Sequence, residues 1–384
     1  MSDEVKLAWS TADAELHQLL ECTLRPRNFQ CPSPSGPVVV DELYCGAGCS
    51  LSFLIKPLLF ALAEGKRFSV PASRFAMGEP CTGSSTRRRS ACFFRGDEST
   101  HGEIASDAVL VKQDWEGQAV SPASAQAGSL PGAAAIFYSS WFALVARLLA
   151  SLTQPSDRMR QHVQHVAGQL GIDDELHRPL LSLHVRQGDA CSDPEAAKSK
   201  GRAQCLGLDA YAPYVDAMIR AHDYKAIYIA TDSEEVVQDA TRRWHLNATA
   251  ARTLRLRDPL RVLFQPIDRS RYAIFASKQS IRQGWTIEKL LWAKQLASTR
   301  QQLNVTPARE MEEFMTDLYL LARADGFVGS FTSNMDRVAY ALSSAYAASS
   351  TPCLKPFASL GGFWCSDFSR RSGRADKKGG EFDC

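Results

Sequence analysis

Two uninterrupted apolar runs constrain the possible folds of this chain more than any other feature. Residues 180–185 read LLSLHV and residues 226–230 read AIYIA. Such runs are typical of strands inside a parallel sheet, because helices cover both faces of the sheet and neither side of the strand meets water. Helix-period stretches follow at 231–244 and 311–324, and the apolar segment 326–330 predicts a further strand. This alternation predicts an α/β fold with a doubly wound parallel sheet.

The amino-terminal half carries a second pattern of the same kind. VVV at 38–40 predicts a strand, CGAGC at 45–49 a tight turn, 50–63 an apolar helix, and KRFSV at 66–70 another strand. Residues 80–132 are rich in Ser, Gly and Arg, have few periodic features and are expected to form loops.

Together the two patterns predict two Rossmann-like domains facing a cleft. Their expected bounds are 31–165 and 175–350, and the second includes a further helix at 334–345. The polar tail 366–384 contains Gly, Lys and Arg and is expected to be disordered.

Composition excludes several classes of protein. The 384 residues carry 44 Lys and Arg against 42 Asp and Glu, a net charge of +2, which lacks the basic surface of a dedicated nucleic-acid-binding protein. The apolar stretch 51–63 contains Lys56 and Pro57, and 133–152 contains Arg147. Both therefore predict buried helices rather than membrane spans. The acidic, polar first residues indicate neither a signal peptide nor an anchor.

The cysteine content points to the cellular compartment. The chain contains 11 cysteines, several in Gly- or Pro-rich surroundings, and two N-x-T sequons at Asn247 and Asn304. These features favour an oxidising compartment, such as the Golgi lumen of the secretory pathway, although a cytoplasmic location stays open. Metal binding is the competing explanation for the cysteines. Because no paired CxxC spacing or Cys/His cluster supports a metal site, disulfides are expected.

The segment HVRQGD (184–189) closes the first apolar run and is the strongest candidate for a functional site. His184 and Arg186 lie two residues apart, so on a strand their side chains point to the same face. An arginine can hold a phosphate through two parallel hydrogen bonds and stays charged at every relevant pH. The structural alternative is an ion pair with a carboxylate such as Asp189. Because ligands collect at the carboxyl ends of strands in open α/β sheets, an anion site is favoured.

Three further segments place polar or glycine residues at the ends of predicted strands. Gly46 and Gly48 let a ligand approach the backbone closely, or form a tight turn between Cys45 and Cys49, and both can hold at once. Asp232 either contacts a ribose hydroxyl or base amine, or caps the next helix, for which Ser233 is the other candidate. The last segment starts a predicted helix, where a phosphate site and ordinary capping are both open, and consists of Thr332, Ser333 and Asn334.

Taken in order, these segments resemble the fucosyltransferase superfamily that contains the eukaryotic core α1,6-fucosyltransferase and its bacterial nodulation relatives. CGAGC, the helix after it and GKRFSV resemble the opening of that fold, and HVRQGD matches the H-V-R-R-x-D signature. YIATDSEEVVQDA is similar to the Y-L-A-T-D-D segment. DLYLLARADGFVGSFTSNMDRVAYAL matches D-x-x-x-L-x-x-A-D-F-x-V-x-x-F-S-S-Q-x-x-R-V-A-Y with its spacing intact. The resemblance covers 31–350.

The resemblance implies a GT-B-type arrangement and an inverting, metal-independent transfer of fucose from GDP-fucose, without a cofactor. The absence of any D-x-D spacing from the sequence agrees with a metal-free mechanism. The family's diphosphate-binding arginine matches Arg186, and the histidine that lines its donor pocket matches His184. Asp232 matches the acid of the ATD segment, and Asp317 matches the helix acid on the guanine or ribose side. The remaining donor-binding matches are Gly46, Gly48, Thr332, Ser333 and Asn334.

The resemblance assigns the catalytic base less directly than the donor-binding residues. The core-fucosylating enzymes carry a glutamate where this chain has Pro194. Asp193 or Glu195 must then supply the carboxylate that activates the acceptor hydroxyl, and Glu195 is favoured. Ala190 also replaces a lysine of the family.

The resemblance also bears on the cysteines. It implies a disulfide between Cys45 and Cys49, because the family closes this glycine loop in that way. The loop 190–206 differs from the family, and a bridge between Cys191 and Cys205 is expected there. Around the FSS motif, where the family has a disulfide, this chain has Gly329 and Asp336.

The implied function is transfer of fucose to a glycan hydroxyl, with an α1,6 linkage to the core GlcNAc of an N-glycan or to a related chito-oligosaccharide favoured. The expected partners are GDP-fucose and a glycan or glycoprotein acceptor. Two alternatives to this function stay open. One is a relative of the protein O-fucosyltransferases, acting on Ser or Thr. The other is a non-catalytic GDP-sugar- or glycan-binding protein that has lost its base.

Overall fold

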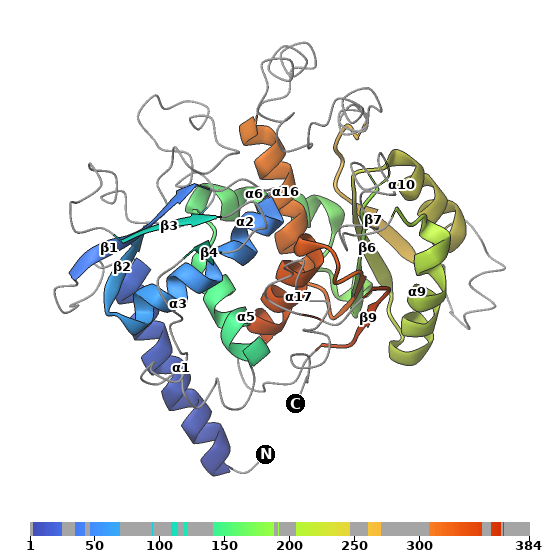
Figure 1. The fold of residues 1–384 in the computed structure, drawn as a ribbon. Coiled ribbons are helices and arrows are strands. Elements are labelled where there is room, and N and C mark those ends of the chain that lie inside the picture. Colours follow the sequence, from blue (N-terminus) through green and yellow to red (C-terminus); the bar gives the residue numbers. More distant parts are fainter. Residues whose placement is uncertain are drawn as a thin grey trace, which may run out of the picture.

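The computed structural model describes most of the regular elements of the chain. The described residues are 3–24, 35–42, 47–69, 94, 109–113, 119–120, 141–187, 191, 205–245, 260–269, 307–347, 355–361 and 364. They form two β-sheets with helices between and around them (Figure 1). No helix in this part of the chain combines the length and apolar character that crossing a membrane requires.

The first sheet is mostly parallel. Its strands, in the spatial order β2-β1-β3-β4, are β1 (Ser35–Glu42), β2 (Lys66–Ser69), β3 (Val109–Gln113) and β4 (Ala119–Val120). β1 pairs in parallel with β2 and β3, and β4 adds an antiparallel edge. The predicted strands at 38–40 and 66–70 are confirmed. The prediction of loops throughout 80–132 is wrong at β3 and β4, because an apolar run as short as VLV in β3 shows no periodicity.

The second sheet is fully parallel. Its order is β7-β6-β5-β8-β9, with the strands β5 (Leu180–Val185), β6 (Ala226–Thr231), β7 (Arg261–Phe264), β8 (Gly326–Gly329) and β9 (Phe357–Ser359). All four pairings are parallel. Every residue of β5, β6 and β8 is buried, which confirms the prediction from their uninterrupted apolar runs. The parallel α/β class is therefore confirmed.

The helices of the amino-terminal half are α1 (Asp3–Leu24), α2 (Ala47–Phe53), α3 (Ile55–Ala63), α5 (Trp141–Leu152) and α6 (Asp157–Leu170). The single helix predicted at 50–63 is two helices, which meet at Leu54. α6 is capped at its amino end by Ser156, whose side chain accepts a hydrogen bond from the Met159 N–H, and at its carboxyl end by Gly171 in the left-handed region with φ 64°.

The carboxyl-terminal half supplies α9 (Leu208–His222), α10 (Glu234–Ala240), α16 (Pro307–Ala322) and α17 (Asn334–Ala347), the 3-10 turn η5 (Glu175–His177) and the π-helical turn η6 (Thr241–His245). The helices predicted after 231, at 311–324 and at 334–345 correspond to α10, α16 and α17. Of the two candidate caps for α10, Ser233 is the cap, because its Oγ accepts a hydrogen bond from the Val236 N–H.

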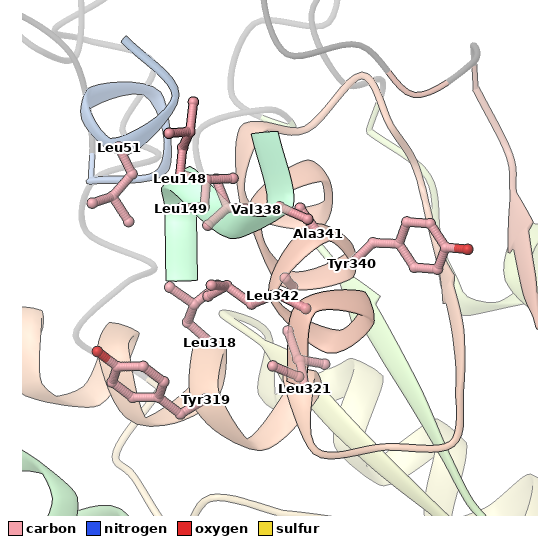
Figure 2. Packing of buried hydrophobic residues seen from close by; sticks show 14 of the residues in the cluster. Leu51, Leu148, Leu149, Leu318, Tyr319, Leu321, Val338, Tyr340, Ala341 and Leu342 are labelled. Carbon is pink, nitrogen blue, oxygen red and sulfur yellow. The ribbon is translucent and has the colours of Figure 1, made fainter. Parts of the chain in front are cut away.

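One hydrophobic cluster joins the two halves (Figure 2). Leu51 of α2 and Leu149 of α5 belong to the same buried cluster as Leu318 of α16 and Leu342 of α17, and none of the four exceeds 2% exposure. α16 and α17 lie between the two sheets (Figure 1). A second cluster, which includes Leu183, packs α9 and α10 onto the other face of the second sheet. The core is thus continuous from the first sheet to the second.

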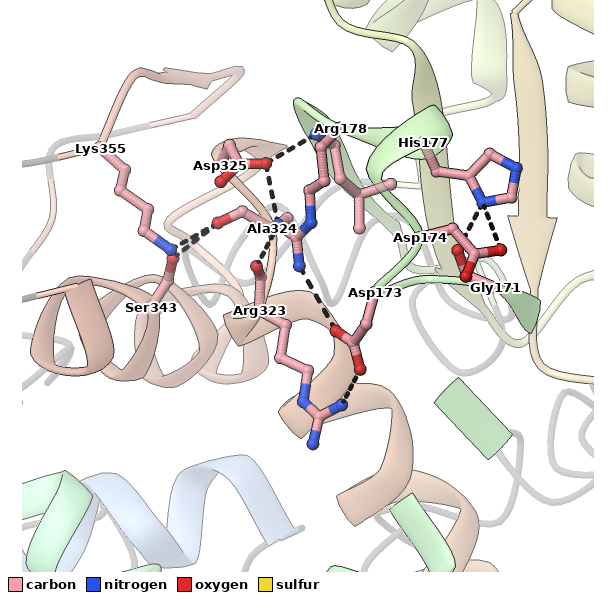
Figure 3. A network of polar contacts seen from close by, with 11 residues as sticks. Gly171, Asp173, Asp174, His177, Arg178, Arg323, Ala324, Asp325, Ser343 and Lys355 are labelled. Carbon is pink, nitrogen blue, oxygen red and sulfur yellow. Dashed lines mark hydrogen bonds and ion pairs between the residues drawn. The ribbon is translucent and has the colours of Figure 1, made fainter. Parts of the chain in front are cut away.

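The amino ends of β5 and β8 are tied together by ion pairs and backbone contacts (Figure 3). Arg178 Nη1 donates to Oδ2 of Asp325 at 2.8 Å, and the same oxygen accepts the Leu180 N–H at 2.8 Å. Lys355 Nζ donates to the Ala324 carbonyl at 2.6 Å. The polar groups named here are paired within the chain, so their role at this edge is structural.

Candidate functional site

The carboxyl ends of β5, β6 and β8 lie side by side at the opposite edge of the second sheet. His184 of β5 pairs in parallel with Ala230 of β6, and β8 pairs in parallel on the other side of β5. The chain therefore leaves these strands at one edge, with Arg186 after β5, Asp232 after β6 and Ser330 after β8. This is the edge at which ligands bind in open α/β sheets.

His184 is held by a carboxylate that the sequence analysis did not include in the site. Both His184 and Asp336 are buried, and Nδ1 of the ring is hydrogen-bonded to Oδ1 of Asp336 in the first turn of α17. Oδ2 of Asp336 accepts the Ser330 N–H at 2.7 Å. Burial alone would lower the pKa of His184, but the charge of Asp336 and the hydrogen bond to it raise that pKa above 6.5. One carboxylate thus joins the end of β5 to the turn after β8.

Asp232 connects the ends of β5 and β6. Its Oδ1 accepts the Gln187 N–H at 2.9 Å. Since Ser233 caps α10, the carboxylate of Asp232 is used instead to fix the backbone next to Arg186. The side chain of Arg186 is half-buried, and its positive charge acts on His184. His184 and Arg186 therefore lie together at one strand end.

Asp317 of α16 lies behind this edge in a buried polar cluster. Its Oδ1 accepts a hydrogen bond from Tyr228 Oη at 2.5 Å. Arg269 is buried nearby and donates to the carbonyls of Thr231 and Gln265, at 3.1 and 2.9 Å. Burial raises the pKa of Asp317 to about 6, although the hydrogen bond from Tyr228 and the charges of Arg269 and His184 oppose the rise. Asp317 therefore titrates close to neutral pH.

This pKa has a measurable effect on stability. Because the folded-state pKa of Asp317 lies above the ordinary 3.8, its favourable contribution is complete below pH 3.8 and is lost as the pH rises through 6. Relative to Asp317→Asn, which does not titrate, the wild-type free energy of unfolding should fall by roughly 3 kcal/mol between pH 4 and 7. Urea denaturation of both proteins across this range measures the difference. If the free energies of unfolding of the two proteins changed equally with pH, the expected titration of Asp317 would be contradicted.

The turn before α17 is fixed by its own side chains and by β9. The hydroxyls of Ser330 and Thr332 are hydrogen-bonded at 2.7 Å, and Asn334 Oδ1 accepts from Arg337. The Phe331 N–H donates to Ser359 Oγ of β9 at 3.1 Å. Ser333 Oγ, in contrast, is buried and has no hydrogen-bond partner among the described residues. Of the three predicted donor-binding residues here, Thr332 and Asn334 support the turn through their side chains, whereas the Ser333 hydroxyl does not, and donor binding by all three stays a prediction.

Gly48 brings α2 against the start of α17. A Cβ atom on Gly48 would lie 2.9 Å from the backbone nitrogen of Met335 and 3.2 Å from the carbonyl carbon of Asn334. Both neighbours are backbone atoms and cannot turn aside. A residue without a side chain is therefore required where the amino-terminal half meets the site.

Replacing Gly48 with alanine should lower the free energy of unfolding by about 1–3 kcal/mol, because α2 must move away from α17. Gly168 of α6 is a matched control, since a Cβ there would meet nothing within 4 Å. Gly168→Ala should raise the free energy of unfolding by up to about 1 kcal/mol through helix propensity alone. Chemical denaturation measures the free energy of unfolding of both variants. An equal change in the two would contradict the close contact at Gly48.

Several predicted features lie wholly or partly outside the described residues. Gly46 and both candidate bases, Asp193 and Glu195, are among them. The expected bridge between Cys191 and Cys205 is present, with an S–S distance of 2.06 Å. The pairing of Cys45 with Cys49 stays a prediction: Cys49 forms a disulfide, but Cys45 is outside the described residues. Within the described ranges, no group of three or more His, Cys, Asp and Glu residues is arranged to hold a metal ion.

The sequence analysis missed Asp336, Tyr228 and Arg269 as members of the site. An acid in the first turn of a predicted helix was the available signal for Asp336, but such acids usually serve the helix dipole alone. Tyr228 was visible only as part of an apolar strand. Arg269 follows β7, which has only four residues and was not predicted.

Comparison with known proteins gives structural resemblances only. No protein-family model and no curated sequence matches the chain. Among solved structures, a mutant of Arabidopsis thaliana FUT1 in complex with GDP is 10% identical, with a TM-score of 0.42 over 89% of this chain and 76% of that one. NodZ α-1,6-fucosyltransferase soaked with GDP-fucose is 13% identical, with a TM-score of 0.40 over 80% and 92%. POFUT1 in complex with GDP-fucose is 10% identical, with a TM-score of 0.34; 66% of this chain aligns with 55% of that one, about half its length.

Proposed function

We propose that this chain is an inverting, metal-independent glycosyltransferase that moves fucose from GDP-fucose to a glycan hydroxyl. One observation carries the proposal: Arg186, His184 and Ser333 all lie at the carboxyl ends of β5 and β8 in a parallel sheet. The arginine charge acts on His184, and the buried Ser333 hydroxyl has no hydrogen-bond partner among the described residues. The motif order in the sequence then favours GDP-fucose over other anionic ligands.

The chemistry of fucose transfer requires such a site. Breaking the bond between fucose and phosphate builds negative charge on the leaving diphosphate. A fixed guanidinium at Arg186, together with donors at the start of α17, would stabilise that charge without a metal ion. Asp317 would accept hydrogen bonds from the guanine or ribose, and Glu195, or failing that Asp193, would deprotonate the acceptor hydroxyl.

The two sheets suit a two-domain arrangement around the acceptor. In the proposed organisation, residues 31–165 form the acceptor-side Rossmann-like domain and residues 175–350 form the GDP-sugar-binding domain. The close contact of Gly48 with Asn334 and Met335 supports a site to which both halves contribute. The favoured acceptor is a chito-oligosaccharide or the core GlcNAc of an N-glycan, joined through an α1,6 linkage.

Titration of the purified chain with GDP-fucose and GDP-mannose tests the donor. We expect saturable binding that prefers GDP-fucose. A well-folded sample that binds no GDP-sugar would overturn the proposed function. Once the donor is established, an acceptor screen with chito-oligosaccharides, N-glycans and folded Ser/Thr-containing domains separates α1,6 transfer from protein O-fucosylation. Donor binding without transfer to any acceptor would identify a binding protein instead.

A further inference from the structure

Asp336 is buried at the carboxyl edge of the sheet, with 1% of its surface exposed. Within the described residues, its carboxylate makes two hydrogen bonds, and both lead to the ends of strands at this edge. Oδ1 is bound to Nδ1 of His184 at the end of β5, and Oδ2 accepts the Ser330 N–H after β8. A Cβ atom on Gly329 would lie 2.7 Å from the Phe327 ring and 3.0 Å from Cγ of Asp336. The turn after β8 therefore has no room for a side chain beside this carboxylate.

The contact fixes the protonation of the ring at one nitrogen. A carboxylate accepts hydrogen bonds but does not donate them, so Nδ1 of His184 must carry a proton. Nε2 is the remaining polar atom of the ring, and it has no hydrogen-bond partner among the described residues. An anionic ligand at this edge would meet a neutral acceptor at Nε2 if the ring were uncharged, and a charged donor if the ring were an imidazolium.

We propose that Asp336 is a positioning residue that holds His184 as a doubly protonated cation, so that Nε2–H is available to an oxygen of the bound diphosphate. The inference rests on the proposed function, since it takes the diphosphate to be the ligand. It assigns Asp336 a role in ligand binding beyond joining β5 to the turn after β8.

The charged groups around His184 support this assignment on balance. Asp336 of α17 and Asp232 after β6 favour the imidazolium, whereas burial and the charge of Arg186 oppose it. Asp317 of α16 also interacts electrostatically with the ring. Tyr211 of α9 is also close to this group. Its burial and the charges of Asp336 and Asp232 raise the pKa of its hydroxyl, which therefore stays protonated. The result is a pKa for His184 above the ordinary 6.5.

Asp336→Asn is the variant that separates charge from structure. The amide oxygen can still accept the Ser330 N–H, but a neutral amide cannot stabilise an imidazolium. Asp325→Asn is the matched control, because Asp325 likewise accepts a backbone N–H and binds a cation, Arg178, at the opposite edge of the same sheet (Figure 3). A purely structural effect would appear in both variants.

Isothermal titration with GDP between pH 5.5 and 8.5 is the first readout. In the wild type, GDP affinity should hold through neutral pH and fall only above the raised pKa of His184. In Asp336→Asn, the fall should begin at least one pH unit lower, with affinity about tenfold weaker at pH 7.5 and a smaller difference at acidic pH. Asp325→Asn should keep the wild-type profile. Superimposable pH profiles for Asp336→Asn and the wild type would overturn the inference while leaving the proposed function intact.

Nitrogen NMR of the wild-type ring is the second readout, and it does not depend on whether Asp336→Asn folds. His184 is assigned by the signal lost in His184→Gln. Both ring nitrogens of His184 should be protonated at pH 7. A neutral ring at that pH would overturn the inference. If the wild type bound no GDP, the proposed function would fail, and with it the diphosphate role, whereas the NMR result would still decide whether Asp336 holds the ring as a cation.

Discussion

Replacing Glu195 with glutamine is expected to slow fucose transfer by about 100-fold or more, because a general base in hydrogen-bond reach of the reacting hydroxyl contributes 10²–10⁴ to the rate. Glutamine keeps the size of the side chain but cannot accept the proton. GDP-fucose affinity should stay at the wild-type level, since Glu195 is not among the proposed donor contacts. Initial rates with a chito-oligosaccharide acceptor, measured beside donor titrations, provide the test.

Asp193→Asn is the matched control for this experiment. It removes the other candidate carboxylate, two residues away in the sequence. If Glu195 is the base, Asp193→Asn should transfer fucose at close to the wild-type rate. A large loss in Asp193→Asn together with normal transfer in Glu195→Gln would reverse the assignment. Normal transfer in both would remove these two carboxylates as candidates for the base.

Replacing Arg186 with alanine should weaken GDP-fucose binding by about 10- to 100-fold, the range expected when charge-assisted hydrogen bonds to a diphosphate are lost. The GDP-fucose affinity of Arg186→Lys should lie between those of the wild type and Arg186→Ala, because lysine keeps the charge but cannot make two parallel hydrogen bonds. Calorimetric titration with GDP-fucose and with GDP measures both changes. Since the diphosphate is common to the two ligands, both affinities should fall in parallel.

Arg220→Ala is the control for a general charge effect. Arg220 is exposed in the last turn of α9, so removing it changes the net charge by the same amount without touching the proposed site. GDP-fucose affinity should be unchanged in this variant. A loss equal to that of Arg186→Ala would mean that the overall field of the protein, not a specific contact, attracts the nucleotide.

The strands that carry the site could be predicted because their signal is local. LLSLHV and AIYIA are apolar throughout, and burial on both faces is the usual reason for such a run. Arg186 and Asp232 then followed from their position just after a strand. In contrast, β3 has five residues and β7 has four, and such short strands are stabilised mainly by packing against neighbouring strands. Little in their own sequence therefore distinguishes them from loops.

The contacts that complete the site could not be predicted, because they join distant parts of the chain. His184 and Asp336 are 152 residues apart, and Tyr228 and Asp317 are 89 apart. Spacing within a motif says nothing about such pairs. The same holds for Gly48, where the need for a glycine arises from the backbone of α17 and not from the turn in which the residue lies.

The hydrophobic cluster that runs from α2 through α5 to α16 and α17 has a consequence for how the molecule opens. Local unfolding of α17 would expose Leu51 and Leu149 to solvent, together with one face of the second sheet. The amides of α5 and of α17 should therefore exchange with solvent in one cooperative event. By linkage, a nucleotide held at the start of α17 would slow hydrogen exchange in α5, a helix that makes no part of the proposed donor site.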